Sequence, residues 1–196
     1  MVGAAQRDAL YSNLFAGFAA RYADSLSVEQ LDVGRWIGEH MMALSDIAQS
    51  GDLCLAHNDF RLDNMLFGRG FSGPEPLATD RAVPALTVVD WQTARLGSGP
   101  ADAAYFVGAG LLEHDRRRHE TSLLDTYAQT LGQYGVSVDR DSLDLLYKVG
   151  ATTGYIMAVI ASQIVEQTER GDAMFVAMAS RHAGQILDLD VAAAFA

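Results

Sequence analysis

The sequence predicts an α+β fold that is mostly helical and contains a small region of short strands. Three observations lead to this prediction. Apolar residues recur at helical spacing over residues 4–50. Three short apolar runs of strand length follow, at 53–56, 65–67 and 86–89. From about residue 101 onward, the sequence again indicates a series of helices.

Residues 4–50 are expected to form two helices. The first apolar stripe contains Leu10, Leu14, Phe15, Phe18 and Tyr22, and the second contains Val28, Leu31, Trp36, Ile37, Met41, Leu44 and Ile47. Ser27 precedes the second stripe, and Gln30 follows three residues later, which is the spacing of a capping box. His40 lies on or beside that stripe, and we interpret it as a packing residue rather than a ligand.

The most informative stretch of the chain lies in the strand region. His57, Asp59 and Asn64 follow the spacing H-x-D-x-x-x-x-N, between two apolar runs that we expect to be buried strands. A tight loop there would keep Asp59 and Asn64 close together. The third run ends at Asp90, which lies beside this loop if the strands pair. Cys54, in the first run, is interpreted as a small buried residue.

These residue types suit phosphoryl transfer from a nucleotide to a hydroxyl group. That reaction needs a carboxylate to accept the hydroxyl proton and oxygen ligands to hold magnesium against the phosphates. Asp59 would supply the carboxylate, and Asn64 and Asp90 would supply the ligands. Two motifs in order, each at a predicted strand end, form a specific signal, whereas either motif alone is weak.

The two motifs resemble those of a known group of kinases. HNDFRLDN at 57–64 and VVDWQTARLGSGPADAAYF at 88–106 are similar to motifs of the aminoglycoside phosphotransferase and choline kinase-like (CHK kinase-like) group, within the protein-kinase-like fold. The resemblance runs from about residue 25 to the C-terminus and includes ERGDAMFVAMASRHAGQILDLD. It implies that residues 1–196 form one domain, the mostly helical C-terminal lobe of that fold.

The resemblance implies a role for each motif residue. Asp59 and His57 are the candidate catalytic residues, with Asp59 as the base and His57 holding the loop by hydrogen bonds. Asn64 and Asp90 are the candidate ligands of the magnesium and ATP cofactors. Asp102 matches the acidic residue that opens the next helix and braces the catalytic loop.

The chain departs from the group at a few positions. Where the group commonly has glycine after the histidine, this chain has Asn58, and asparagine is among the few residues that tolerate a left-handed backbone. Gln92 stands where the group often has glutamate. The adjacent Trp91 either packs in the core or lines the substrate pocket, and the core is the favoured interpretation.

The remaining segments give further expectations. Helices are predicted at about 101–113, 117–134, 140–169 and 172–187. The basic run at 116–118 is interpreted as a solvated helix start that provides local charge balance, rather than as an anion site. Residues 68–73 match G-x-G-x-x-G, but prolines follow where a dinucleotide site needs a helix, so we expect a hairpin connection instead.

Composition limits the partners and the location. The net charge of -11 and the pI of about 4.7 argue against nucleic acid or an anionic membrane as partner, because both need a basic surface. The single cysteine excludes an internal disulfide and a thiolate metal site. No signal peptide and no membrane-length apolar run is recognised, and we therefore expect a cytoplasmic protein.

The N-terminal nucleotide lobe of a kinase is not recognised in the sequence. Such a lobe supplies a lysine and a glycine-rich loop to the phosphates, whereas the only lysine here is Lys148, far downstream. We therefore expect the nucleotide lobe to be absent from this chain, through truncation, a mis-called start or gene splitting, and in the last case to be a separate partner.

Three functions are compatible with these features. The favoured one is an ATP-dependent phosphotransferase lobe that acts on a small-molecule hydroxyl and is poorly active alone. The alternative is an inactive binding or regulatory module. A metal-dependent hydrolase is the weakest, because nothing positions a second metal or an attacking water.

Overall fold

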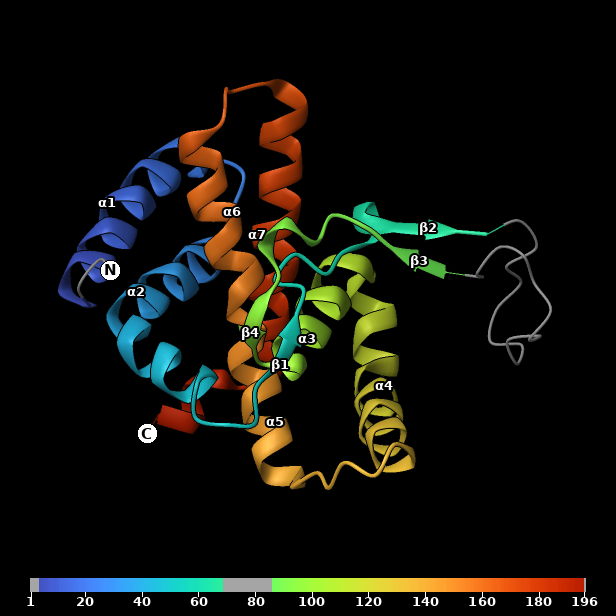
Figure 1. The fold of residues 1–196 in the computed structure, drawn as a ribbon. Coiled ribbons are helices and arrows are strands. Elements are labelled where there is room, and N and C mark those ends of the chain that lie inside the picture. Colours follow the sequence, from blue (N-terminus) through green and yellow to red (C-terminus); the bar gives the residue numbers. More distant parts are fainter. Residues whose placement is uncertain (1–3, 69–85, 196) are drawn as a thin grey trace.

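The computed structural model describes residues 4–68 and 86–195, with side chains from Leu10 onward. It confirms a mostly helical α+β fold (Figure 1). The helices are α1 (Ala4–Tyr22), α2 (Val28–Ala48), α3 (Gly99–Gly110), α4 (Glu113–Gln133), α5 (Arg140–Gly150), α6 (Thr152–Ile164) and α7 (Glu169–Asp188). The strands are β1 (Cys54–Ala56), β2 (Met65–Phe67), β3 (Leu86–Val88) and β4 (Arg95–Gly97), and short 3-10 helices occur at Leu62–Asn64, Trp91–Thr93 and Val191–Phe195.

The predicted capping box starts α2. The Ser27 hydroxyl accepts a hydrogen bond from the backbone N–H of Gln30 at 3.2 Å, and the Gln30 side chain accepts one from the Ser27 N–H at 2.9 Å. Later in the helix, His40 stacks on Trp36 with ring centroids 4.6 Å apart and bonds the Trp36 carbonyl. His40 therefore packs against its own helix, as expected.

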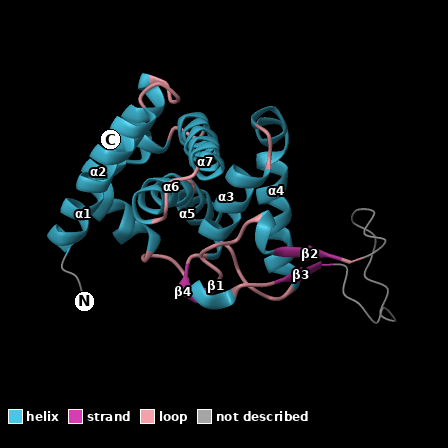
Figure 2. Cartoon of the chain, turned by 90° about the horizontal axis from the view of Figure 1, so that it is seen from above, coloured by secondary structure: helices cyan, strands magenta, loops and turns pink. Residues whose placement is uncertain are grey.

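One hydrophobic cluster runs through all the helices, from Tyr11 on α1 to Val191 after α7. Figures 1 and 2 show α6 and α7 between the α1–α2 pair on one side and α4 on the other. Tyr155 on α6 is fully buried and donates its hydroxyl hydrogen to the Gln30 carbonyl at 2.8 Å. At Gly34 on α2, an added Cβ would lie 2.2 Å from the Phe15 ring, so this glycine permits the close approach of α1 and α2.

The single helix predicted over 140–169 is wrong, because the chain forms α5 and α6 with an interruption at Ala151. Next to that interruption, the Thr152 hydroxyl donates to the Val149 carbonyl at 2.7 Å, and such bonds within a helix often bend it. The other predicted helices lie within a few residues of those observed.

The segment Arg140–Ile164, which covers α5 and α6, does have the length and composition of a membrane span, contrary to the expectation, and an 18-residue window within it has a mean hydropathy of 1.3. However, 61% of that window is buried inside the fold, as in the core helix of a soluble protein.

The strands form two separate antiparallel pairs. β1 pairs with β4, with Cys54 opposite Gly97, and β2 pairs with β3, with Met65 opposite Val88. The second pair is the pairing that the sequence predicted. The connection between β2 and β3, including most of the G-x-G-x-x-G match at 68–73, lies outside the described residues.

The expectation of buried strands is wrong. Leu55 and Leu66 are 68% and 58% exposed, and Cys54 is also exposed rather than buried. The physical reason is that each sheet has only two short strands, and no described element covers their outer faces. Within the described ranges no sheet has more than two strands.

Candidate active site

The catalytic loop is fixed to the first turn of α3 by Asp102. One carboxylate oxygen accepts a hydrogen bond from the His57 N–H at 2.5 Å, and the other accepts one from the Asn58 N–H at 2.9 Å. Hydrogen bonds to a charged acceptor are about twice as strong as neutral ones. The position near the helix N-terminus also favours a negative charge. Asp102 therefore braces the loop in the way that the resemblance implied.

Asn58 has the left-handed backbone that the sequence predicted, with φ of 62°. Its side-chain amide donates to the carbonyls of Ala56 and Thr93 at 3.1 and 3.3 Å, and its side-chain oxygen accepts from Arg95 at 3.2 Å. The side chain thus joins the loop to β1 and to the segment that leads into β4, which glycine could not do.

His57 is buried and uses both ring nitrogens within the protein. Its Nε2 lies 2.9 Å from the Val89 carbonyl, so Nε2 carries the hydrogen, and its Nδ1 accepts from the Asp59 N–H at 3.3 Å. Because a carbonyl can only accept and an N–H can only donate, this pair of bonds selects the neutral ring with hydrogen on Nε2. These are the contacts of a residue that holds the loop in place.

The structure brings Asp59 and Asn64 together. The Asn64 side-chain amide donates both to the Asp59 backbone carbonyl at 2.8 Å and to the Asp59 Oδ2 at 2.9 Å. Asn64 is buried, and its backbone carbonyl accepts a hydrogen bond from the Val89 N–H at 2.9 Å. Because its amide hydrogens face Asp59, the amide oxygen of Asn64 is left available as a ligand.

Two further residues contact the Asp59 carboxylate. The Tyr105 hydroxyl lies 3.3 Å from Oδ1, and the Arg61 Nε lies at the same distance from the same oxygen. Burial and the charge of Asp59 raise the pKa of Tyr105 far above its ordinary value, so the hydroxyl keeps its hydrogen and donates it. The Arg61 contact is an ion pair without hydrogen-bond geometry, and its Nε–H is buried with no acceptor among the described residues.

Sequence reasoning missed both of these contacts. Tyr105 follows Asp102 by three residues on α3, so both side chains lie on one face of that helix, toward the loop. That spacing is a signal that could have identified Tyr105.

Asp90 directly follows Val89. The main-chain hydrogen bonds of Val89 to His57 and to Asn64 hold this point of the chain beside the catalytic loop. The backbone of Asp90 is left-handed, with φ of 63°, and its carboxylate is exposed and makes no hydrogen bond to a described residue. The carboxylate is therefore available to a ligand.

The donor atoms fit magnesium. Asn64 and Asp90 offer oxygen atoms, which Mg²⁺ prefers, and no cluster of three or more His, Cys, Asp and Glu occurs in the described part of the chain. A site with one or two protein ligands is the usual one for Mg²⁺ bound together with phosphates.

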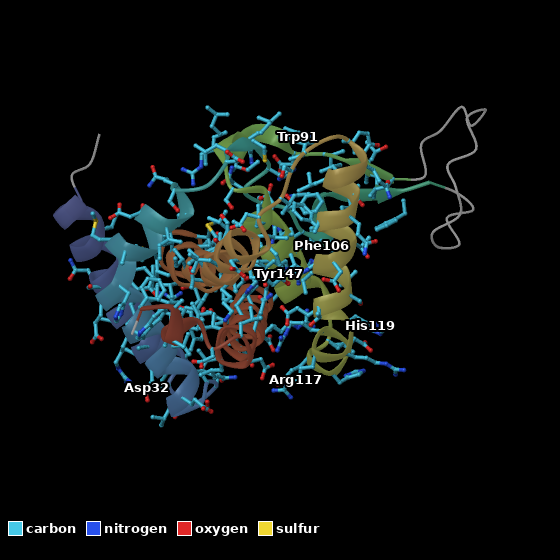
Figure 3. All side chains as sticks on the ribbon, turned by 90° about the horizontal axis from the view of Figure 1, so that it is seen from below. Asp32, Trp91, Phe106, Arg117, His119 and Tyr147 are labelled. Atoms are coloured by element: carbon cyan, nitrogen blue, oxygen red, sulfur yellow. The ribbon has the colours of Figure 1, made fainter. Side chains whose placement is uncertain are left out.

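The interpretation of Trp91 as a core residue is wrong. Its side chain is 50% exposed, its ring lies 4.8 Å from that of His57, and its Nε1–H donates to the Val88 carbonyl at 3.0 Å. Figure 3 shows Trp91 at one end of the molecule, far from Arg117 and His119. The reason is that Trp91 begins the short 3-10 helix Trp91–Thr93, none of whose residues is buried.

The basic run on α4 is only partly as expected. It does lie in the first turns of a helix and gives local charge balance, since Arg117 pairs with Asp188 and Glu113. However, Arg116 is not solvated: it is 1% exposed and pairs with Glu120 at 2.7 Å and with Asp188. A buried guanidinium requires such partners, because an unpaired buried charge is costly. This cluster lies away from the catalytic loop (Figure 3).

A cavity of about 240 Å³ lies next to the catalytic loop. Its wall includes Arg61 and Tyr105, the two residues that contact the Asp59 Oδ1. The rest of its wall comes from the same loop, from the C-terminal end of α3 and from α7: Leu62, Asp63, Ala109, Gly110, Met174, Ala177, Met178 and Arg181.

Comparison with known proteins gives one match. A family model described as the ecdysteroid kinase-like family matches residues 8–138, about two thirds of the chain, which includes both motifs and the helices from α1 to α4. No curated protein and no solved structure matches the chain.

Proposed function

The chain belongs to the ecdysteroid kinase-like family, and from this premise we propose that it is the catalytic lobe of a small-molecule phosphotransferase. Membership supports a kinase-like phosphotransferase at a coarse level. The finer proposal is that the lobe transfers a phosphoryl group from ATP to a hydroxyl of a small substrate, with Asp59 as the base and Asn64 and Asp90 as magnesium ligands.

One observation supports this function above the others. Two motifs that are distant in the sequence meet through the backbone of Val89, and they bring a carboxylate, an amide oxygen and a second carboxylate to one end of the molecule. Phosphoryl transfer depends mostly on positioning and charge stabilisation, and this is the constellation that it needs.

The mechanism assigns a task to each side chain. Asp59 accepts the proton of the attacking hydroxyl, while Asn64 and Tyr105 each donate to one of its oxygens and so fix the carboxylate plane. Each carboxylate oxygen keeps a free lone pair for the proton. Arg61 places positive charge beside the Asp59 carboxylate. When bound to Asn64 and Asp90, magnesium would neutralise the phosphate oxygens.

We further propose that a nucleotide lobe covers the exposed strand faces. Leu66 on β2, Leu96 on β4 and the nearby Trp91 are each at least half exposed, and a docked lobe would remove these apolar side chains from water. The only lysine, Lys148, lines a different cavity together with Arg116, and it therefore cannot pair the phosphates at this site. The chain alone should accordingly have little turnover.

The same lysine observation favours the second candidate function, a kinase-like module that binds without catalysing. Calorimetric titration of the chain with ATP and Mg²⁺ separates the two. We expect binding that is lost in Asp90→Ala and kept in Asp52→Ala, which removes an exposed carboxylate outside the site. A folded chain that binds no Mg·ATP, or binds it equally after Asp90→Ala, would favour the non-catalytic module.

A second experiment tests the base. When a nucleotide lobe is supplied, Asp59→Asn should abolish phosphoryl transfer while Mg·ATP binding persists. Retained turnover in this variant would contradict the role of Asp59.

A further inference from the structure

We propose that the 240 Å³ cavity beside Asp59 binds the acceptor, and that the acceptor is an apolar molecule that carries both a hydroxyl and a carboxylate. In this proposal Arg181 binds the carboxylate. The inference deepens the phosphotransferase function proposed above and rests on it for the role of the hydroxyl.

The position of the cavity supports an acceptor site. Its wall includes Arg61 and Tyr105, which both lie 3.3 Å from the Asp59 Oδ1. A molecule in the cavity can therefore present a hydroxyl to the Asp59 carboxylate. The volume is below the usual range for ligand pockets, so the cavity suits a small molecule or one end of a larger one.

One face of α7 forms the apolar wall. The wall residues on α7 follow Met174 at intervals of three, four and seven positions, so their side chains project from the same side of the helix. They are Ala177, Met178 and Arg181. Methionine side chains adapt to irregular shapes, which suits a wall that receives an apolar body. The arginine lies at the end of this stripe.

Arg181 is the cation that the protein leaves without a counter-charge in this cavity. Its Nη1 donates to the Ala109 carbonyl at 2.7 Å, and it forms no ion pair with any residue that the structure describes. By contrast, Arg61 pairs with Asp59 and with Asp63 at 3.6 Å. Among the described side chains, the other arginines that form no ion pair are exposed, whereas Arg181 is half-buried.

The chemistry of that group favours a carboxylate ligand. A guanidinium has five N–H donors, of which Arg181 uses one, and its planar fork matches the two oxygens of a carboxylate. A neutral alcohol in the cavity would remove water from Arg181 without replacing the lost hydrogen bonds, which costs free energy. The cavity thus combines a base for the hydroxyl with a cation for the acid.

Binding to the chain itself tests this inference, without ATP or magnesium. The probes are 4-(hydroxymethyl)benzoate and 12-hydroxydodecanoate, each beside its methyl ester, with the methyl signals of Met174 and Met178 followed by NMR. We expect both acids to shift these signals and to bind about tenfold more tightly than their esters. Arg181→Gln should remove this preference, and Arg181→Lys should retain part of it.

Arg170→Gln is the matched control, because Arg170 is an exposed arginine at the start of the same helix, outside the cavity. It should keep the preference for the acids. Equal binding of acids and esters, no binding of either acid, or a preference that survives Arg181→Gln would overturn the inference. Because the assay contains no nucleotide, an acid preference together with failed Mg·ATP binding would leave the cavity assignment intact and contradict only the phosphotransferase function.

Discussion

Acidification should destabilise this protein through His182, a histidine in the middle of α7. The side chain is fully buried, and its ring lies 5.5 Å from that of Tyr105. It fills space next to Gly154, where an added Cβ would come within 1.9 Å of its Nε2. Neither ring nitrogen forms a hydrogen bond of ordinary geometry with a described residue, although the Gln185 side chain and the Ala151 backbone lie close to the ring.

This environment disfavours the charged ring. Burial is the largest cause and lowers the pKa of His182 from 6.5 to about 4. The positive charges of Arg116 and Arg181 act in the same direction, whereas the Gln185 side chain and the Ala151 backbone oppose the shift. The ring is therefore neutral in the folded protein down to about pH 4.

The sign of the effect follows from proton binding. Between pH 6.5 and about 4 the unfolded chain binds a proton at His182 and the folded chain does not, so the free energy of unfolding falls as the pH falls. The loss is about 1.4 kcal/mol per pH unit and about 3 kcal/mol over the whole window. Above pH 6.5 the His182 ring is neutral in both the folded and the unfolded chain, so it causes no further change in the free energy of unfolding.

Urea denaturation at several pH values between 7.5 and 4 measures this effect. His182→Gln should show a shallower loss of stability across the window, because the titrating group is gone while the carboxylates that also respond to acid remain. His119→Gln, which removes an exposed histidine on α4, should keep the slope of the parent. Identical slopes for the parent and His182→Gln, or an NMR titration that gives His182 an ordinary pKa, would refute this reasoning.

Three substitutions give sharper local tests. Gly150→Ala should destabilise the fold by about 1–3 kcal/mol in urea denaturation, because its Cβ would lie 2.4 Å from the Ala101 Cα where α5 meets α3. Gly132→Ala on α4 has no atom within 4 Å of its Cβ and should instead stabilise by about 0.5–1 kcal/mol; a loss there would contradict the packing. Asp102→Asn leaves one accepting oxygen for the two N–H groups of His57 and Asn58, so one of them loses its partner. The free energy of unfolding should fall by about 1–3 kcal/mol, and amide exchange of the catalytic loop should accelerate. Unchanged exchange would contradict the bracing role.

The features that the sequence predicted correctly depend on local chemistry. The Ser27 cap follows from a fixed three-residue spacing, and the left-handed Asn58 follows from the few residues that tolerate that backbone. The pairing of 65–67 with 86–88 could be predicted because both runs are apolar and flank an evident connection.

The features that could not be predicted from the sequence depend on which other elements cover each helix or strand. The strand Arg95–Gly97 has no apolar alternation, and only its partner β1 defines it. Trp91 and Cys54 are residue types typical of a core, but Trp91 lies on an exposed 3-10 helix and Cys54 lies on a strand without an outer layer. Arg116 is buried because Glu120 on its own helix and a carboxylate on α7 neutralise it, and the second of these is distant in sequence.

Val89 connects the two motifs without using its side chain. Its N–H bonds the Asn64 carbonyl, and its own carbonyl accepts from the His57 ring. Every amino acid except proline offers the same pair of main-chain atoms. The contact between the motifs is therefore insensitive to the identity of this residue, and substitutions at position 89 can accumulate while the base and the metal ligands keep their relative positions.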